Sequence, residues 1–83
     1  MRAQGVERGI PDLLIIDRPP RCLHFVGVAL ELKRTNGKPS DLRPEQREWL
    51  ERFDARGWAS AVAYGADAAI DWLRAMGFGA GRG

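Results

Sequence analysis

The stretch ALELKRTNGKPSDL, residues 29–42, ends an apolar run with two opposite charges and then enters a basic loop. Glu31 and Lys33 lie one on each side of Leu32. Because successive side chains of a β-strand point to opposite faces, both charges emerge on the same face if this segment is a strand. A carboxylate and an ammonium together on the strand of a small domain indicate a candidate functional site.

The residues around this pair predict a strand over 22–33. One set of alternating positions is apolar and predicts the core face: Val26, Val28, Leu30 and Leu32. On the other face, the small residues Gly27 and Ala29 precede the charged pair. Small side chains beside charges leave space, so this face is expected to border a cleft.

The rest of the chain predicts two further strands and two helices. The apolar run 13–16 predicts a strand buried on both faces, 44–56 a helix, 58–64 a third buried strand and 67–76 a second helix. Pro44 suits the first position of a helix, Asp67 suits an N-cap, and Gly57 and Gly77 suit helix ends. This order predicts an α/β domain with a mixed sheet. Residues 1–10 are expected to form a loop and 78–83 a flexible tail.

Composition limits the class of protein. The 83 residues suffice for a single domain over 1–83, and the formal net charge of +2 is too small by itself to argue for nucleic-acid binding. A single cysteine excludes an internal disulfide framework and a multi-cysteine zinc site. The single cysteine also fits a cytosolic, reducing setting. No apolar run has the length of a membrane span, and no signal-peptide pattern opens the chain.

Asp12 lies at the start of the first predicted strand, and this position could bring it close to Glu31 and Lys33. If the first two strands are antiparallel neighbours, Asp12 lies beside Glu31. Two close carboxylates repel each other unless a cation neutralises them, and oxygen ligands suit Mg²⁺. Lys33 could then position an attacking water or stabilise negative charge that develops on a phosphate.

The segments GIPDLLII, ALELKR, GKPSDLRPEQREWLERFDARGW and AIDWLRAMGF occur in this order. Together they resemble the VRR-NUC domain, the virus-type replication-repair branch of the PD-(D/E)xK nuclease superfamily, from about Gly5 to Phe78. Either short motif alone is a weak signal. The resemblance implies a restriction-endonuclease-like fold and a metal-dependent DNA endonuclease that uses Mg²⁺ or Mn²⁺.

The resemblance also implies roles for individual residues. Asp12 and Glu31 match the two motif carboxylates that bind metal, and Lys33 matches the motif lysine. The backbone carbonyl of Leu32 corresponds to a further metal ligand, and Gln46 to a glutamine on the helix that borders the active site. Stand-alone phage and bacterial members form homodimers and act on branched DNA such as four-way junctions.

One departure from the family pattern concerns the start of the chain. Family members carry a helix before the GxPD segment, which often supplies another acidic ligand. That N-terminal helix is expected to be absent here, and Glu7 is a poor substitute. Reading the gene upstream of Met1 would test whether the chain is a truncated form.

Five basic residues cluster in sequence near the two motif segments and together fit a phosphodiester substrate: Arg8, Arg34, Lys38, Arg43 and Arg47. The alternative for each of them is a solvated surface charge. Ser40 is a further candidate for DNA contact, although it could instead shape the loop. Contacts to the DNA backbone are expected to outnumber contacts to bases.

Alternatives remain for the other candidates. Glu31 and Lys33 could be an exposed ion pair, and Gln46 a polar residue at the rim of the core. The three tryptophans are expected in the core or at a dimer interface rather than as platforms for bases. A catalytically inactive module that binds structured DNA or only dimerises is the main functional alternative, and a small α/β fold without a nucleic-acid role is another.

Overall fold

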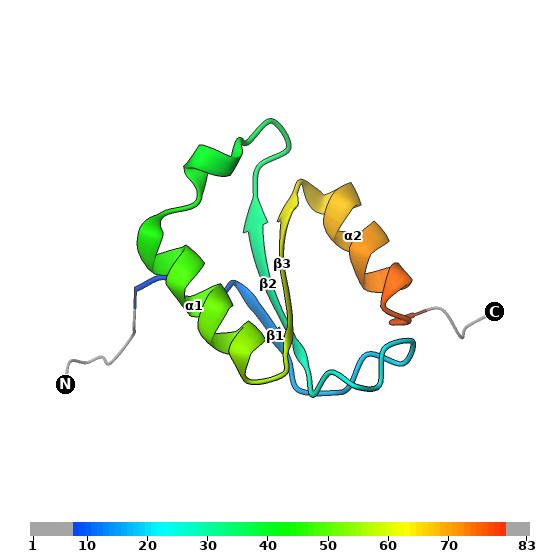
Figure 1. The fold of residues 1–83 in the computed structure, drawn as a ribbon. Helices are drawn as coiled ribbons and strands as arrows, with labels where there is room; N and C mark the ends of the chain where they lie inside the picture. Colours follow the sequence, from blue (N-terminus) through cyan, green and yellow to red (C-terminus); the bar gives the residue numbers. More distant parts are fainter. Residues whose placement is uncertain (1–7, 80–83) are drawn as a thin grey trace.

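The computed structural model describes residues 8–79. Its elements follow the predicted order and are β1 (Leu13–Ile15), β2 (Val28–Lys33), the short 3₁₀ helix η1 (Pro39–Asp41), α1 (Pro44–Ala55), β3 (Ala59–Tyr64) and α2 (Ala66–Ala75). Figure 1 shows the sheet between α1 and α2, so the described residues form three layers.

The sheet is mixed, as the sequence predicted. Its strand order is β1-β2-β3, with β1 antiparallel and β3 parallel to the central β2. In the first pair, Leu13 lies opposite Leu30 and Ile15 opposite Val28. The parallel step from β2 to β3 requires a crossover, which η1 and α1 supply.

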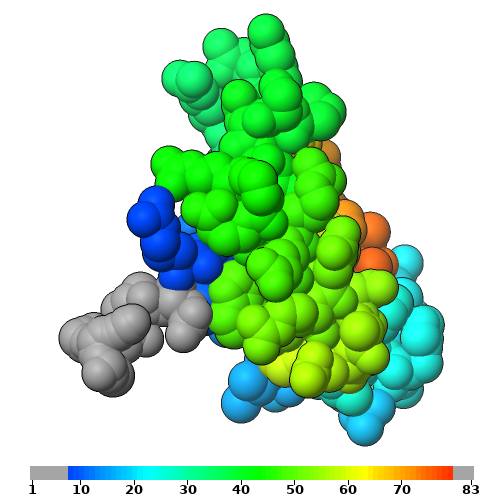
Figure 2. Space-filling model, turned by 60° about the vertical axis from the view of Figure 1, so that its left-hand side comes forward, coloured from blue at the N-terminus to red at the C-terminus, as the bar shows by residue number. Residues whose placement is uncertain are grey.

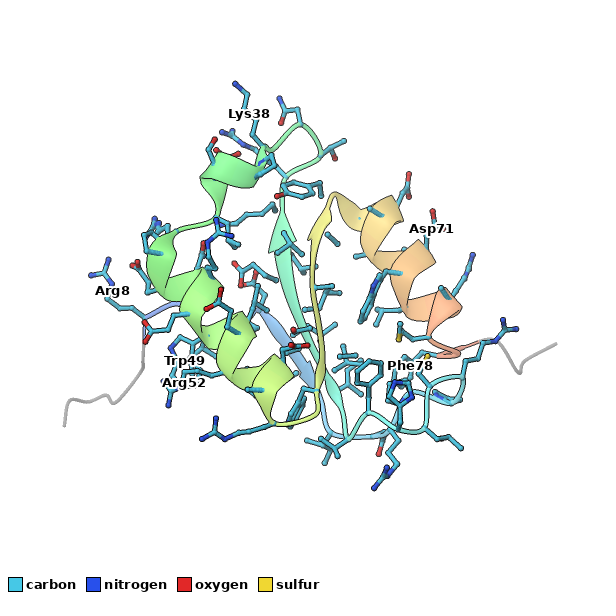
Figure 3. The ribbon with its side chains drawn as sticks, viewed as in Figure 1. Arg8, Lys38, Trp49, Arg52, Asp71 and Phe78 are labelled. Atoms are coloured by element: carbon cyan, nitrogen blue, oxygen red, sulfur yellow. The ribbon has the colours of Figure 1, made fainter. Side chains whose placement is uncertain are left out.

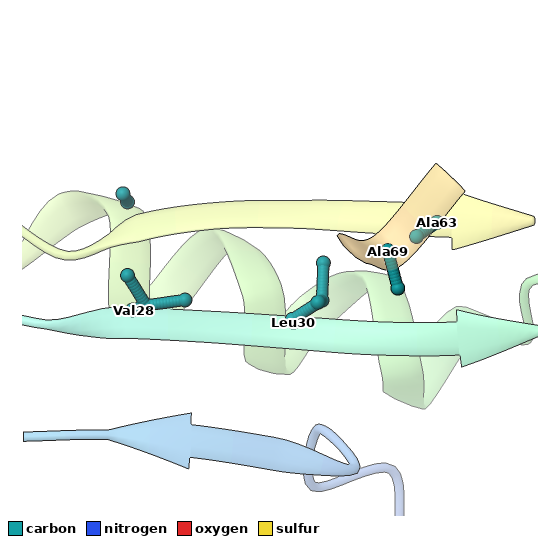
Figure 4. Close-up of a cluster of buried hydrophobic side chains, with 5 residues drawn as sticks. Val28, Leu30, Ala63 and Ala69 are labelled. Carbon is teal, nitrogen blue, oxygen red and sulfur yellow. The ribbon is translucent and has the colours of Figure 1, made fainter. Parts of the chain in front are cut away.

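The main core lies between the sheet and α2. It is formed by Val28, Leu30, Ala59, Ala63 and Ala69 (Figure 4). Because the contributions of β3 and α2 to this cluster are alanines, α2 can pack close to the strands, and the larger Val28 and Leu30 fill the space. Burial of such side chains supplies the main favourable free energy of folding.

The other face of the sheet packs against α1. Ala29 is completely buried, and Leu50 of α1 is 8% exposed. Ala29 shares its face with Glu31 and Lys33, because these positions alternate along β2. The face that carries the charged pair is therefore covered by α1.

The second strand begins later than predicted, at Val28 rather than at residue 22. The backbone before it turns. Cys22 N–H donates to the carbonyl of Pro19, and Phe25 N–H donates to that of Cys22, at 3.0 and 3.1 Å. Val26 N–H donates to the carbonyl of Gly57 at 3.0 Å. Residues 22–27 therefore form turns and loop contacts instead of the strand that the alternation of apolar residues predicted.

Several apolar residues are more exposed than predicted. Leu14 and Ile16 are 42% and 82% exposed, so β1 is not buried on both faces. Val26 and Leu32, assigned to the core face of β2, are also exposed. For Leu14 and Ile16, the physical reason is that β1 is an edge strand and that the helices pack mainly on β2 and β3.

The predicted cleft beside Gly27 and Ala29 is filled by protein atoms. A Cβ at Gly27 would lie 2.7 Å from the Trp58 ring and 2.7 Å from the carbonyl oxygen of Ile15, so Trp58 occupies that space. Ala29 is buried under α1. The predicted cleft at Gly27 and Ala29 is therefore absent from the described part of the chain.

The helix boundaries follow the proline and glycine positions. Pro44 occupies the first position of α1, and Gly57, with φ +91°, follows its end. Gly65 is the N-cap of α2, and Asp67 lies in the first turn rather than at the cap. Phe78, assigned to the tail, packs against the core.

The remaining parts of the predicted loop and tail, 1–7 and 80–83, lie outside the described residues. Between residues 8 and 79, no helix is long and apolar enough to cross a membrane.

Candidate active site

The pairing of β1 with β2 brings the two motif carboxylates together. One step beyond the Leu13–Leu30 pair, the same register sets Asp12 opposite Glu31. The Asp12 carboxylate, through Oδ2, accepts a hydrogen bond from the backbone N–H of Leu32 at 2.9 Å. This bond fixes an exposed side chain beside the end of β2, and the antiparallel pairing on which the predicted site depends is present.

Glu31 is the one buried charged residue within residues 8–79, at 3% exposure. Its Oε2 accepts a hydrogen bond from Gln46 Nε2 at 2.9 Å and lies 3.8 Å from Lys33 Nζ. Its Oε1 is buried and has no hydrogen-bond partner in the described part of the chain. The side chains of Glu31 and Lys33 are 4% and 17% exposed, so the solvent-exposed ion pair is ruled out.

Gln46 connects the charged residues to α1. Its Oε1 accepts hydrogen bonds from Lys33 Nζ at 2.9 Å and from the backbone N–H of Arg43 at 2.8 Å, while its Nε2 donates to Glu31. The Arg43 bond belongs to the start of α1, where the third helical residue reaches back to the N-cap. Gln46 is therefore hydrogen-bonded to both members of the charged pair, and its role at an active site stays a prediction.

The electrostatics of the site disfavour an ionised Glu31. Burial, and then the negative charge of Asp12, raise the pKa of the Glu31 carboxyl above its usual range, while Lys33 opposes the shift. The ionised form of such a buried carboxyl is destabilising unless it takes up a proton or another cation approaches it.

The donor set fits a hard divalent cation. Glu31 Oε1 needs a partner, and the Asp12 carboxylate is adjacent. Within the described range, no group of three or more acidic, histidine or cysteine side chains could hold a metal. Two carboxylates nevertheless suit Mg²⁺, which keeps several waters in its coordination sphere. The Leu32 carbonyl stays a predicted ligand, and Glu7 lies outside the described residues.

The basic residues predicted to contact DNA lie in separate places on the structure. Arg8 lies near Glu45 of α1, with 3.8 Å between its Nε and the carboxylate. Arg47, two residues after Glu45, points to the other side of the helix and lines a hollow beside β3. Figure 2 shows the start of the described chain against α1 and the segment around η1 projecting above it.

The projecting segment carries the other predicted DNA contacts, which are the exposed residues Arg34, Lys38 and Ser40. Asp41, rather than Ser40, organises η1, because its Oδ2 accepts a hydrogen bond from the backbone N–H of Lys38 at 2.9 Å. Ser40 is thus not needed to shape this loop and remains a candidate for contact with a ligand.

Sequence reasoning missed a second feature on α1. Trp49, Arg52, Phe53 and Arg56 line a hollow on this helix. Their spacing of three and four residues was visible in the sequence and is typical of one helix face. Figure 3 shows Trp49 and Arg52 on the side of α1 that faces away from α2.

A family model described as the VRR-NUC domain matches residues 1–67, which contain Asp12, Glu31, Lys33 and Gln46. The chain belongs to the VRR-NUC domain family. A solved structure described as "VRR_NUC domain protein" is similar to it, with 29% sequence identity and a TM-score of 0.74. The similarity covers 89% of this chain and 57% of the other, so this chain spans little more than half the length of that protein. No curated protein matches.

Membership of the VRR-NUC family supports the restriction-endonuclease-like fold and, in general terms, a nuclease function. The four residues that match the family motif lie together at the end of β2, beneath the first turn of α1: Asp12, Glu31, Lys33 and Gln46. A VRR-NUC domain without any role in nucleic-acid chemistry is accordingly the weakest of the alternatives.

Proposed function

We propose that this VRR-NUC domain is a metal-dependent DNA endonuclease. Asp12 and Glu31 hold Mg²⁺ or Mn²⁺, and Lys33 and Gln46 complete the site. The observation that carries the proposal is the buried Glu31 Oε1, which lacks a partner among residues 8–79 and lies in a site that already contains a second carboxylate. A purely structural ion pair between Glu31 and Lys33 would not account for a buried oxygen that lacks a partner.

When bound, the metal would polarise a phosphate oxygen and make an attacking water more acidic. The chain's own residues position and stabilise the charges around that reaction. Lys33 Nζ has three donors, of which one is directed to Gln46 Oε1. Its remaining donors are available to a water or to a phosphate oxygen that gains negative charge.

Gln46 is a positioning residue for both charged groups. By accepting from Lys33 and donating to Glu31, it holds an ammonium and a carboxylate in fixed relative positions. Preorganised donors of this kind lower the barrier because they need no rearrangement as charge develops. The rigid placement of Gln46 in the first turn of α1 supports this role.

Branched DNA, such as a four-way junction, is the proposed substrate, and a homodimer the proposed active form. Both follow from the family resemblance. The exposed Leu14 and Ile16 at the sheet edge support a dimer, because apolar surface of this kind is often buried against a partner. Two paired sites could cut two strands. The proposed setting is the bacterial cytoplasm, including that of a phage-infected cell.

Cleavage of a labelled four-way junction, beside its linear duplex arms, tests the activity. The reaction is run with Mg²⁺ or Mn²⁺ and with EDTA, using the wild-type protein, Lys33→Ala, and Arg74→Ala as a charge control on α2. Metal-dependent cutting that Lys33→Ala abolishes and Arg74→Ala retains is expected. Equal cutting of junction and arms would remove the proposed branch preference.

The alternative is an inactive module that binds structured DNA or only dimerises. Calorimetric titration with Mn²⁺ separates the outcomes, because an intact site binds the ion and Glu31→Gln weakens that binding. A folded protein that neither binds Mn²⁺ nor cuts DNA would favour the inactive module, and a monomer by light scattering at micromolar concentration would exclude the dimer.

A further inference from the structure

A second candidate site lies on α1, apart from the metal site. It is a hollow of about 120 Å³ lined by Trp49, Arg52, Phe53 and Arg56. Within residues 8–79, its lining residues take no part in the hydrogen bonds or ion pairs of the carboxylates or in the main core cluster. The lining combines two large aromatic rings with two guanidinium groups.

The rings of Trp49 and Phe53 lie close together, with 6.0 Å between their centroids and a tilt of 38° between their planes. Arg52 lies over the Trp49 ring, with 4.1 Å from the guanidinium carbon to the ring centroid. Phe53 packs edge-on against Trp58 at 5.0 Å, which anchors the inner wall of the hollow. An indole ring with a guanidinium group over it offers an aromatic and cationic surface on which a base can stack.

The charge of the hollow is not neutralised by the described residues. Within residues 8–79, neither Arg52 nor Arg56 forms an ion pair with a carboxylate. Arg56 Nη1 makes one long hydrogen bond of 3.5 Å to the backbone carbonyl of Arg52, which leaves most donors of both side chains free in this part of the chain. An anionic ligand with a planar group would satisfy both features of the lining.

The position relative to the metal site suggests what this ligand is. Gln46 marks the metal site, and the helix rise sets Trp49 to Arg56 roughly 5–15 Å further along α1. That distance corresponds to a few nucleotides of a nucleic-acid strand. A strand that passes Asp12 could therefore reach the hollow without leaving α1.

We propose that the Trp49–Arg52–Phe53–Arg56 hollow binds an unpaired nucleotide of the substrate strand, with its base stacked on the Trp49–Arg52 pair and its phosphate bonded by Arg56. The proposal rests on the proposed function for the identity of the substrate. It adds that the substrate carries a single-stranded segment near the cut, since a base within a duplex is not free to stack on protein.

Helix stability and self-association are the two competing roles for this hollow, and each predicts a different result. The arginines lie near the end of α1, where positive charge favourably opposes the helix dipole. In that case they contribute to stability and not to binding. The aromatic residues could instead be buried by a second copy of the chain, as expected for tryptophans from the sequence. Binding and oligomeric state must therefore be measured together.

The test is fluorescence anisotropy with labelled oligothymidylate and with a duplex of matched length, in EDTA so that no cleavage occurs. The variants are Trp49→Leu, Trp49→Phe, Arg56→Gln and, as a control of equal charge change, Arg74→Gln on α2. Trp49→Leu should weaken single-strand binding about fivefold or more, and Trp49→Phe should largely restore it.

Salt dependence distinguishes the two kinds of contact. Arg56→Gln should reduce the slope of log affinity against log salt by ~0.7, the value for one phosphate contact on a single strand, whereas Trp49→Leu should leave the slope unchanged. Arg74→Gln should change neither affinity nor slope. Far-ultraviolet circular dichroism and light scattering are recorded for every variant.

Several results would overturn the proposal. These are equal losses on duplex and single strand, unchanged binding by Trp49→Leu, an equal loss by Arg74→Gln, or a change from dimer to monomer in Trp49→Leu. The binding assay uses no metal and leaves Asp12, Glu31 and Lys33 intact. Failure of cleavage with the expected binding pattern would thus refute the nuclease and retain the nucleotide site, and the reverse result would refute only this inference.

Discussion

Replacing Glu31 with glutamine should have opposite consequences with and without a divalent cation. Glu31→Gln keeps the side-chain shape and retains an oxygen for Gln46 Nε2. It removes a buried negative charge from beside Asp12, and the new amide can donate toward that carboxylate. In EDTA at pH 8, the variant should therefore be more stable than the wild type, although it has lost a charged partner for Lys33.

The magnitude follows from the unpaired oxygen. An unsatisfied buried polar atom costs on the order of 1–3 kcal/mol, and the lost attraction to Lys33 at 3.8 Å offsets part of the gain. A net gain of about 1 kcal/mol would raise the melting temperature by about 4–8 °C in a domain of this size. A cation present at ten times its Kd should stabilise the wild type by about 1.4 kcal/mol and leave the variant nearly unchanged.

The pH dependence has a defined sign. Burial and Asp12 raise the pKa of Glu31 above its ordinary value of 4.5, so the folded state retains this proton to higher pH than the unfolded state does. The advantage of Glu31→Gln in EDTA should be absent below pH 4.5 and should grow as pH rises through the raised pKa. Thermal unfolding by circular dichroism, from pH 4 to pH 8, measures it.

The matched control is Glu51→Gln, the same chemical change at an exposed position of α1. It should not alter the response to the cation. A Glu31→Gln protein that is less stable than the wild type in EDTA at pH 8, or that gains as much stability from Mg²⁺, would refute the role of the free carboxylate oxygen as a metal ligand.

Three further predictions concern other parts of the site and the fold. Lys33→Met should reduce metal-dependent cleavage by roughly 10²–10³-fold, the loss typical of one preorganised donor; equal cleavage rates would exclude its role. In EDTA it should also lower the melting temperature, because the buried Glu31 loses the cation beside it. Gln46→Ala should cost about 1–3 kcal/mol in urea unfolding, because Lys33 and the helix N-terminus lose an acceptor, and Gln46→Glu should not restore the stability, because its carboxylate would replace the donor to the buried Glu31 carboxylate. Gly27→Ala should destabilise by about 1–3 kcal/mol, since its methyl group would meet Trp58 and the Ile15 carbonyl; an unchanged urea midpoint would show that Trp58 can move aside.

The element order, the mixed sheet and the position of Asp12 beside Glu31 were predictable, whereas the exposure of individual strand residues was not. Glu31 and Lys33 are two residues apart on β2, so their side chains lie on the same face of the sheet whatever packs around them. The exposure of Leu14, Ile16 and Leu32 depends on how far the helices extend over the sheet, and no local pattern encodes that extent. The delayed start of β2 has a similar cause, because its preceding backbone is bonded to distant segments.

The sequence by itself thus determined the strand face, the helix ends at Pro44 and Gly57, and the identity of the acidic pair, since these follow from backbone periodicity and side-chain chemistry. Only the tertiary structure decided that Glu31 Oε1 is buried without a partner among residues 8–79, that Gln46 joins Lys33 to Glu31, and that Arg52 stacks on Trp49 beside an open hollow. Burial and hydrogen bonding between separated segments, as well as rotamer choice within a helix, depend on the packing of the whole fold, which single-residue preferences do not specify.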